Sequence, residues 1–116
     1  MKEKNIIYRQ TQIVYKTTGT GSPVVLIHGF AEDSTIWDNQ VDFLKDKYRL
    51  IIPDLPGSGK SELITNNDTS LEDYAAIIKQ ILDKEKIETC IMIGHSMGGY
   101  ITLAFAEKYN KTKNLF

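Results

Sequence analysis

Residues 94–98, which read Gly-His-Ser-Met-Gly, carry the strongest chemical signal in the sequence. They lie between an apolar run that predicts a strand and a segment that predicts a helix. A serine at so sharp a turn has a strained backbone, and glycines two residues away on either side leave room for the chain to fold back. We therefore interpret Ser96 as a nucleophile, with Gly94, His95 and Gly98 shaping the turn. The alternative interpretation is a glycine-rich turn that contains an incidental serine.

Met97 follows the candidate nucleophile and would open the predicted helix. Its backbone amide would lie at the positive end of the helix dipole. An amide at that position can donate a hydrogen bond to an oxyanion that develops during acyl transfer. The Met97 amide is therefore a candidate donor of an oxyanion hole.

A base for Ser96 is harder to find in the sequence. A serine hydroxyl is a weak nucleophile until a base takes its proton, and a carboxylate usually orients that base. The sequence has only two histidines, His28 and His95. His95 is next to Ser96 in a turn that points successive side chains apart, and His28 is interpreted as tied to loop backbone. The aspartates at positions 33, 38 and 54 are interpreted as loop or cap residues, so these 116 residues alone are predicted to be inactive.

Apolar runs and cap signals predict the elements that position these residues. Continuously apolar runs are typical of strands covered on both faces, and two short β-rich runs near the N-terminus suggest an antiparallel ribbon. Helices are predicted from apolar residues at helical spacing and from Ser70 with Asp73, or Thr69 with Glu72, as a cap. We expect strands at residues 6–8, 13–15, 24–27, 48–52 and 88–93, helices at 36–44, from the cap to about 83 and at 97–109, and the start of another strand at 114–116.

Strands that alternate with helices predict an α/β fold over residues 1–116, with a mainly parallel sheet and helices on both faces. The chain is expected to stop inside this domain, shortly after the helix at 97–109. That would leave the strand ending at residue 93 as an open edge, and such an edge recruits other chains. We therefore expect self-association, or association with a missing C-terminal half.

Three ordered segments resemble the N-terminal half of the α/β-hydrolase fold family. The first is His28-Gly29-Phe30 after the strand at 24–27, and the second is residues 54–61, which read Asp-Leu-Pro-Gly-Ser-Gly-Lys-Ser after the next strand. The third is the turn at Ser96. Together they span nearly all of the chain and follow the predicted strands in the family's order.

This resemblance implies a serine hydrolase that cleaves an ester, thioester or related acyl substrate through an acyl-enzyme. It implies that the Phe30 amide is the second oxyanion donor, with His28 and Gly29 shaping that loop. The family's order of nucleophile, acid and histidine places both partners of Ser96 beyond residue 116. Serine at this position argues against relatives that use aspartate there to open epoxides or remove halogens, whereas carbon-carbon bond hydrolysis, peptidase and acyl-transfer variants stay open.

Two other classes of function share features with this sequence. Gly59-Lys60-Ser61 also ends a phosphate-binding P-loop, but that motif needs glycine where Asp54 stands, which places a carboxylate where phosphate would lie. A non-catalytic α/β module that binds a small molecule or partner is the alternative that remains, because no base for Ser96 was found.

Composition narrows the function further. Fourteen Lys and Arg and fifteen Asp and Glu are interspersed along the chain and give a net charge of -1, which predicts no binding to nucleic acid or membranes. The charged start, without a long apolar stretch, predicts a cytoplasmic protein. The single cysteine, Cys90, is expected to be a small core residue. Without a His/Cys cluster, neither a metal nor an organic cofactor is expected.

Overall fold

A computed structural model describes residues 1–64, 69–109 and 112–115, the last four for their backbone only. Within these residues the chain forms a six-stranded sheet with the order β1-β2-β4-β3-β5-β6. The strands are β1 (Lys2–Tyr8), β2 (Thr11–Thr18), β3 (Ser22–Ile27), β4 (Tyr48–Pro53), β5 (Cys90–Gly94) and β6 (Thr112–Leu115). Strands β4, β3, β5 and β6 run parallel, and β1 and β2 form the antiparallel ribbon. The mainly parallel sheet predicted from the sequence is thus confirmed.

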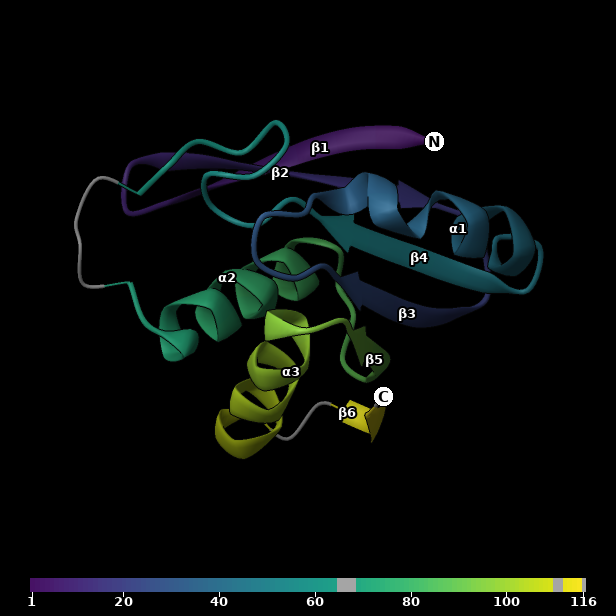
Figure 1. The fold of residues 1–116 in the computed structure, drawn as a ribbon. Helices are drawn as coiled ribbons and strands as arrows, with labels where there is room; N and C mark the ends of the chain where they lie inside the picture. The colour runs from purple at the N-terminus through teal and green to yellow at the C-terminus, as the bar shows by residue number, and fades with distance from the viewer. Residues whose placement is uncertain (65–68, 110–111, 116) are drawn as a thin grey trace.

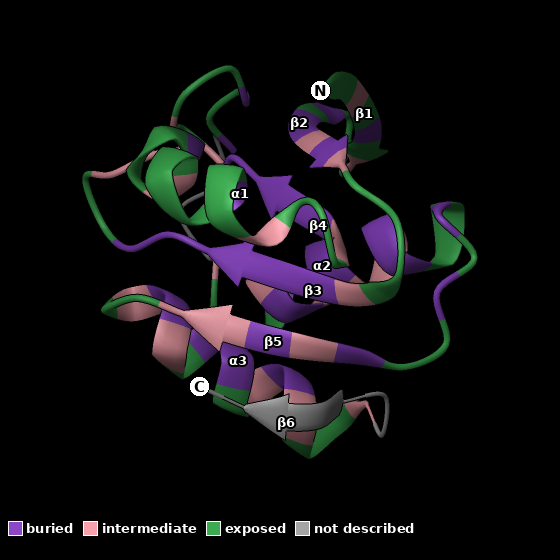
Figure 2. Cartoon of the chain, turned by 90° about the vertical axis from the view of Figure 1, so that its right-hand side faces the viewer, coloured by how far each residue is buried: buried purple, intermediate pink, exposed green. Residues whose placement is uncertain are grey.

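Helices cover both faces of this sheet (Figure 1). They are the 3₁₀ helix η1 (Ser34–Trp37), α1 (Asp38–Leu44), α2 (Leu71–Lys84) and α3 (Met97–Lys108). Alternate residues of β3 point to opposite faces: Val25 and Ile27 join the core under α2 and α3, whereas Val24 and Leu26 join the core under α1. Residues 24–27 of β3 are all buried (Figure 2), which explains why this run of the strand is continuously apolar.

Several predicted boundaries move by a few residues. The first helical segment starts as η1 rather than at residue 36, because the Asp33 carboxylate accepts a hydrogen bond from the Thr35 amide and caps it. Strand β5 starts at Cys90 rather than at 88, after two exposed residues. Helix α3 ends one residue early, because Tyr109 has extended backbone angles.

Two sequence signals are confirmed in detail. Ser70 and Asp73 form a capping box at the start of α2, with each side chain accepting a hydrogen bond from the backbone of the other. Cys90 is 1% exposed and belongs to the core, as expected for a small apolar residue.

The expected open edge at β5 is wrong. Strand β6 pairs with β5 in parallel, so the outer strand on this side of the sheet is β6. The start of a strand was predicted from residues 114–116, of which Phe116 lies outside the described residues. Association of the chain with other chains stays a prediction, with β6 as the edge concerned.

No helix within the described ranges is long and apolar enough to cross a membrane. The same residues contain no group of three His, Cys, Asp or Glu side chains that could hold a metal ion.

Glu85 joins the N-terminal ribbon to the sheet at the end away from Ser96. Its side chain is 3% exposed, and its carboxylate lies 3.0 Å from Lys4 Nζ and 2.6 Å from the Arg49 guanidinium. The buried Tyr15 hydroxyl also donates to it. Burial raises the pKa of Glu85, but the hydrogen bonds from Tyr15, Lys4 and Arg49 outweigh that effect and hold the pKa below its ordinary value.

We expect Glu85→Ala to destabilise the fold by about 2 kcal/mol, because it leaves the buried Tyr15 hydroxyl without its acceptor. It also removes the carboxylate from Arg49, whose guanidinium keeps a bond of 3.3 Å to the carbonyl of residue 85. Since the pKa is lower in the folded state, the stabilisation is present above the unfolded pKa, near 4.5, and is lost as the pH falls through the folded value. Urea unfolding at pH 7 and at lower pH measures both effects. Asp42→Asn is the control, because the Asp42 carboxylate is 78% exposed, and its loss should cost less than about 0.5 kcal/mol.

Candidate active site

The candidate site lies where two neighbouring strands lead to helices on opposite faces of the sheet. Strand β3 leads to η1 and α1 on one face, whereas its neighbour β5 leads to α3 on the other face (Figure 1). The loops after β3 and β5 therefore diverge and leave a crevice at the carboxyl ends of these two strands. Residues 28–30 follow β3 and residues 95–97 follow β5, so the topology brings both predicted segments to one crevice.

Ser96 has the backbone strain that the sequence predicts. Its φ of 58° and ψ of -121° belong to a region that residues with side chains rarely adopt. The residue is exposed and stands at the N-cap of α3. A hydrogen bond of 2.9 Å from the His95 amide to the Ile27 carbonyl ties this turn to the end of β3. Ser96 is thus held at the rim of the sheet.

Glycine is needed on both sides of the turn. A Cβ on Gly94 would lie 2.5 Å from the Gly99 amide nitrogen. A Cβ on Gly98 would overlap the Ile27 carbonyl oxygen and lie 2.8 Å from the His28 carbonyl oxygen. By contrast, the nearest atom to a Cβ on Gly99 would be 3.9 Å away, an ordinary contact. The spacing of Gly94 and Gly98 therefore reflects backbone packed directly on backbone.

His28 is tied to loop backbone, as the sequence analysis proposes. The side chain is fully buried, and its Nε2 accepts a hydrogen bond of 2.9 Å from the Leu55 amide. Its Nδ1 lies 2.8 Å from the Gly29 carbonyl oxygen and must donate to it, because a carbonyl only accepts. These two partners fix the neutral ring with its proton on Nδ1. In this arrangement His28 has no ring nitrogen left for proton transfer to Ser96.

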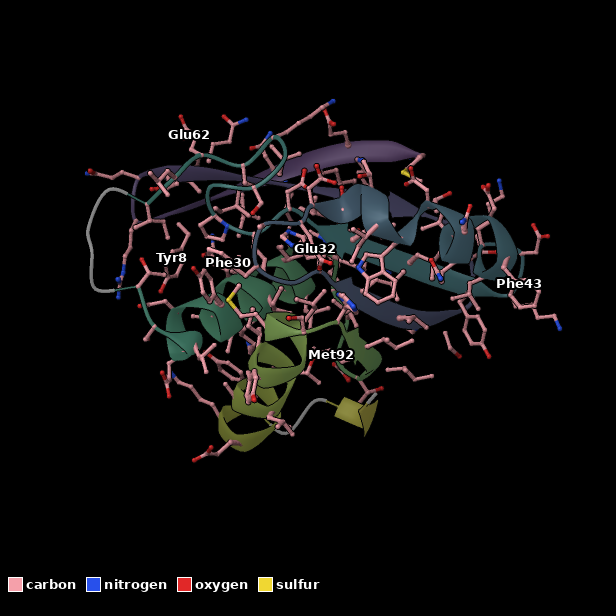
Figure 3. All side chains as sticks on the ribbon, viewed as in Figure 1. Tyr8, Phe30, Glu32, Phe43, Glu62 and Met92 are labelled. Atoms are coloured by element: carbon pink, nitrogen blue, oxygen red, sulfur yellow. The ribbon has the colours of Figure 1, made fainter. Side chains whose placement is uncertain are left out.

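The same bonds orient the peptide between Gly29 and Phe30. The Gly29 carbonyl also accepts from the Glu32 amide, at 3.3 Å, so two donors hold one side of this peptide. In a trans peptide the N–H points away from the C=O, so the Phe30 N–H points away from both donors. Gly29 itself lies against the turn, since a Cβ on it would be 2.8 Å from Ser96 Cβ. Phe30 is 80% exposed and is labelled in Figure 3; it lines a cavity together with Met97.

The amides of Phe30 and Met97 are available to a ligand. Neither donates to a protein acceptor among the residues that the structure describes. For Met97 this is a property of position, because the first amides of a helix have no partner within the helix.

A contact between Glu32 and His95 is not predictable from the sequence pattern. His95 Nδ1 lies 3.0 Å from Glu32 Oε1, so this ring faces the opposite loop rather than Ser96. The hydrogen bond from His95, followed by one from the Gly29 amide, lowers the pKa of Glu32 below its ordinary value. Glu32 has no motif around it, and only the fold brings it to residue 95.

Known proteins share the sequence pattern and the fold of this chain. The sequence profile of a family described as "alpha/beta hydrolase fold" matches residues 22–114. The chain belongs to the α/β-hydrolase fold family. It is 36% identical over 105 residues to a 2-hydroxy-6-oxononadienedioate/2-hydroxy-6-oxononatrienedioate hydrolase of Paraburkholderia phymatum, covering 86% of this chain and 36% of that protein.

Two solved structures show the same fold. A thermophilic esterase from Thermogutta terrifontis is 33% identical, with a TM-score of 0.90 over 99% of this chain and 44% of that one. The epoxide hydrolase CorEH is 26% identical, with a TM-score of 0.93 over 99% of this chain and 41% of that one. The α/β-hydrolase chain described here thus spans well under half the length of these relatives.

The turn after β4 in this α/β-hydrolase lies beside the site and is held by Asp54. Asp54 is buried, and its carboxylate accepts from the amides of Ser34, at 2.8 Å, and Lys60, at 3.1 Å. A Cβ on Gly59 would lie 2.5 Å from Asp54 Oδ1. The interpretation of residues 54–61 as a tight turn, and not as a phosphate-binding loop, agrees with this arrangement.

An apolar cavity of about 280 Å³ opens beside the two predicted oxyanion residues of the α/β-hydrolase. Its walls include the side chains of Phe30, Leu55, Leu63, Tyr74 and Met97. The described residues that line it include no charged side chain. Such a cavity accommodates an uncharged, apolar group beside Phe30 and Met97.

Proposed function

We propose that this α/β-hydrolase is a serine hydrolase that cleaves an ester or thioester through an acyl-enzyme. The observation that supports it most is Ser96 itself, which is exposed and strained at the rim of the sheet, with its Cβ against Gly29. In the proposed reaction Ser96 Oγ attacks the substrate carbonyl carbon while a base takes its proton. The amides of Phe30 and Met97 donate to the oxyanion that forms.

The remaining steps follow from proton balance. The tetrahedral intermediate collapses, and the base returns its proton to the departing alcohol or thiol. Water then attacks the acyl-enzyme, with its proton taken by the same base, and releases the acid and the free Ser96 hydroxyl. No metal or organic cofactor is needed for this sequence of steps.

We propose that the base and its carboxylate come from sequence beyond residue 116. His28 has both ring nitrogens bonded to backbone, and His95 faces Glu32, so neither histidine among the described residues serves Ser96. The relatives are more than twice as long as this chain, which leaves room for both groups. By this proposal the 116 residues alone are inactive.

Serine at position 96 favours acyl transfer over the epoxide opening of the epoxide hydrolase with the same fold. The epoxide hydrolase with the same fold shows that the architecture alone does not decide the reaction. A second candidate is carbon-carbon bond hydrolysis, which is favoured by the 36% identity to the 2-hydroxy-6-oxononadienedioate hydrolase. That relative's dicarboxylate substrate would bring a negative charge, whereas the cavity beside Phe30 and Met97 offers no cation among its described residues.

A neutral and a negatively charged ester distinguish the two candidate functions. For the full-length protein we expect the kcat/KM of p-nitrophenyl butyrate to exceed that of the mono-p-nitrophenyl ester of succinate by at least about 10-fold, because a carboxylate in an apolar cavity loses its hydration. Steady-state kinetics on the two esters measure this ratio. Hydrolysis of 2-hydroxy-6-oxononadienedioate with neither ester cleaved would favour the second candidate. Binding of the esters without turnover would favour a non-catalytic module.

A further inference from the structure

We propose that Glu32 is a positioning residue that fastens the loop carrying Phe30 to the turn carrying Ser96. The inference rests on the proposed function, because it assigns Glu32 a part in aligning the oxyanion donors with the nucleophile. Glu32 does not itself touch the reacting atoms in this proposal.

A single carboxylate oxygen spans the crevice. Glu32 Oε1 accepts a hydrogen bond of 2.6 Å from the Gly29 amide and lies 3.0 Å from His95 Nδ1. Gly29 directly precedes Phe30, and His95 directly precedes Ser96. The carboxylate therefore connects the residue before each predicted functional group.

The loop after β3 is folded tightly around this oxygen. Ala31 has a φ of 62°, a left-handed conformation that is unfavourable for alanine. The Glu32 amide donates back to the Gly29 carbonyl at 3.3 Å, and a Cβ on Gly29 would lie 2.9 Å from Glu32 Oε1. The strain at Ala31 and the missing side chain at Gly29 both let the carboxylate reach its two donors.

The bonds of the Glu32 carboxylate are expected to affect the transition state, because they help to set the position of the Phe30 amide. The Glu32 side chain is 25% exposed and that of His95 is 58% exposed, so solvent screens the contact with His95 more than the bond from the Gly29 amide. If the Gly29 amide loses this acceptor, the His28–Gly29 peptide is released on its N–H side. The Gly29–Phe30 peptide keeps the two bonds to its carbonyl but turns with Gly29, which moves the Phe30 N–H relative to Ser96. Small misplacements of this kind lower kcat, because oxyanion donors act on charge that is absent from the bound substrate.

The next residue offers a matched control. The Asp33 carboxylate also bonds to backbone, but its partner is the Thr35 amide within its own turn. Asp33→Ala removes a neighbouring negative charge and a helix cap without touching the crevice. Glu32→Ala removes the bridge, and Glu32→Gln keeps an oxygen that can accept from both donors.

The first experiment uses the full-length protein and p-nitrophenyl butyrate. We expect Glu32→Ala to lower kcat about 10-fold with KM changed less than about 2-fold, Glu32→Gln to stay within about 3-fold of the unsubstituted protein, and Asp33→Ala to leave kcat unchanged. An unchanged kcat in Glu32→Ala, no rescue by glutamine, or an equal loss in Asp33→Ala would overturn the proposal.

A second measurement does not depend on activity. In the 116-residue chain, amide hydrogen exchange at Gly29 should be at least about 10-fold faster in Glu32→Ala, with exchange at Leu26 in β3 unchanged. Unchanged exchange at Gly29 would overturn the bridge itself. An unsubstituted full-length protein that hydrolyses no ester would instead contradict the proposed function, while the exchange data would still decide the role of Glu32 in the loop.

Discussion

Replacing Ser96 by alanine in the full-length protein is expected to lower kcat for p-nitrophenyl butyrate by about 10⁵-fold or more, because no other group can form the acyl-enzyme. The fold should remain, since the Ser96 side chain is exposed and caps no amide of α3. Kinetics together with thermal unfolding of both proteins measure the two effects separately.

Glycine at the same position sharpens this test. Ser96 has a backbone conformation that glycine adopts without strain, so Ser96→Gly should raise stability by about 1 kcal/mol while abolishing hydrolysis as completely as alanine does. Opposite effects on stability and activity are the signature of strain kept at a functional site. Residual activity near the unsubstituted level in either variant would contradict a nucleophilic role for Ser96.

The substitution Gly98→Ala, which adds one methyl group, is expected to destabilise the fold by about 3 kcal/mol and to lower Tm by roughly 10 °C. The methyl carbon would overlap the Ile27 carbonyl oxygen and press on that of His28, and neither backbone atom can move without shifting the end of β3. Thermal unfolding of the 116-residue chain measures the loss.

Gly99→Ala is the matched control for that substitution. Both glycines lie in α3, but a Cβ at Gly99 meets its nearest atom at 3.9 Å. Alanine is the better helix former, so Gly99→Ala should be neutral or stabilise the fold by up to about 1 kcal/mol. Equal destabilisation by the two substitutions would mean that Gly98 is not packed against β3 as described.

Much of this fold follows from local sequence. The apolar runs at residues 24–27 and 50–52 place β3 and β4, because the part of a strand that is buried on both faces has no polar positions. The turn at Ser96 is predicted from its two flanking glycines, which are needed because backbone packs directly on backbone there. The start of α2 is predicted from the pair of Ser70 and Asp73. These features are decided by residues close together in the chain, so the sequence predicts them.

Contacts between distant segments were not predictable in the same way. Glu32 and His95 are 63 positions apart and meet because β3 and β5 are neighbours in the sheet. Glu85, at the end of α2, likewise bonds to Lys4 in β1 and Arg49 in β4. Nothing near these residues signals a partner, and the order of strands that brings them together depends on packing of the whole sheet.

The placement of β6 shows the same limit at the sheet's edge. Residues 112–115 mix polar and apolar side chains, so their pattern suggested a strand only from its last residues. Pairing with β5 decides the outcome, because an exposed strand edge gains hydrogen bonds by adding a neighbour. The edge of the sheet therefore shifted outward by one strand from the expectation.

Peptide mapping of the full-length protein after reaction with a fluorophosphonate tests the central claim most directly. An activated serine oxygen attacks the phosphorus of the reagent and displaces fluoride. The serine then carries a stable phosphonate ester. We predict one adduct, on Ser96, formed within minutes at neutral pH. An adduct on a different residue, or an unmodified Ser96 in protein that still hydrolyses esters, would contradict the assignment of Ser96 as the nucleophile.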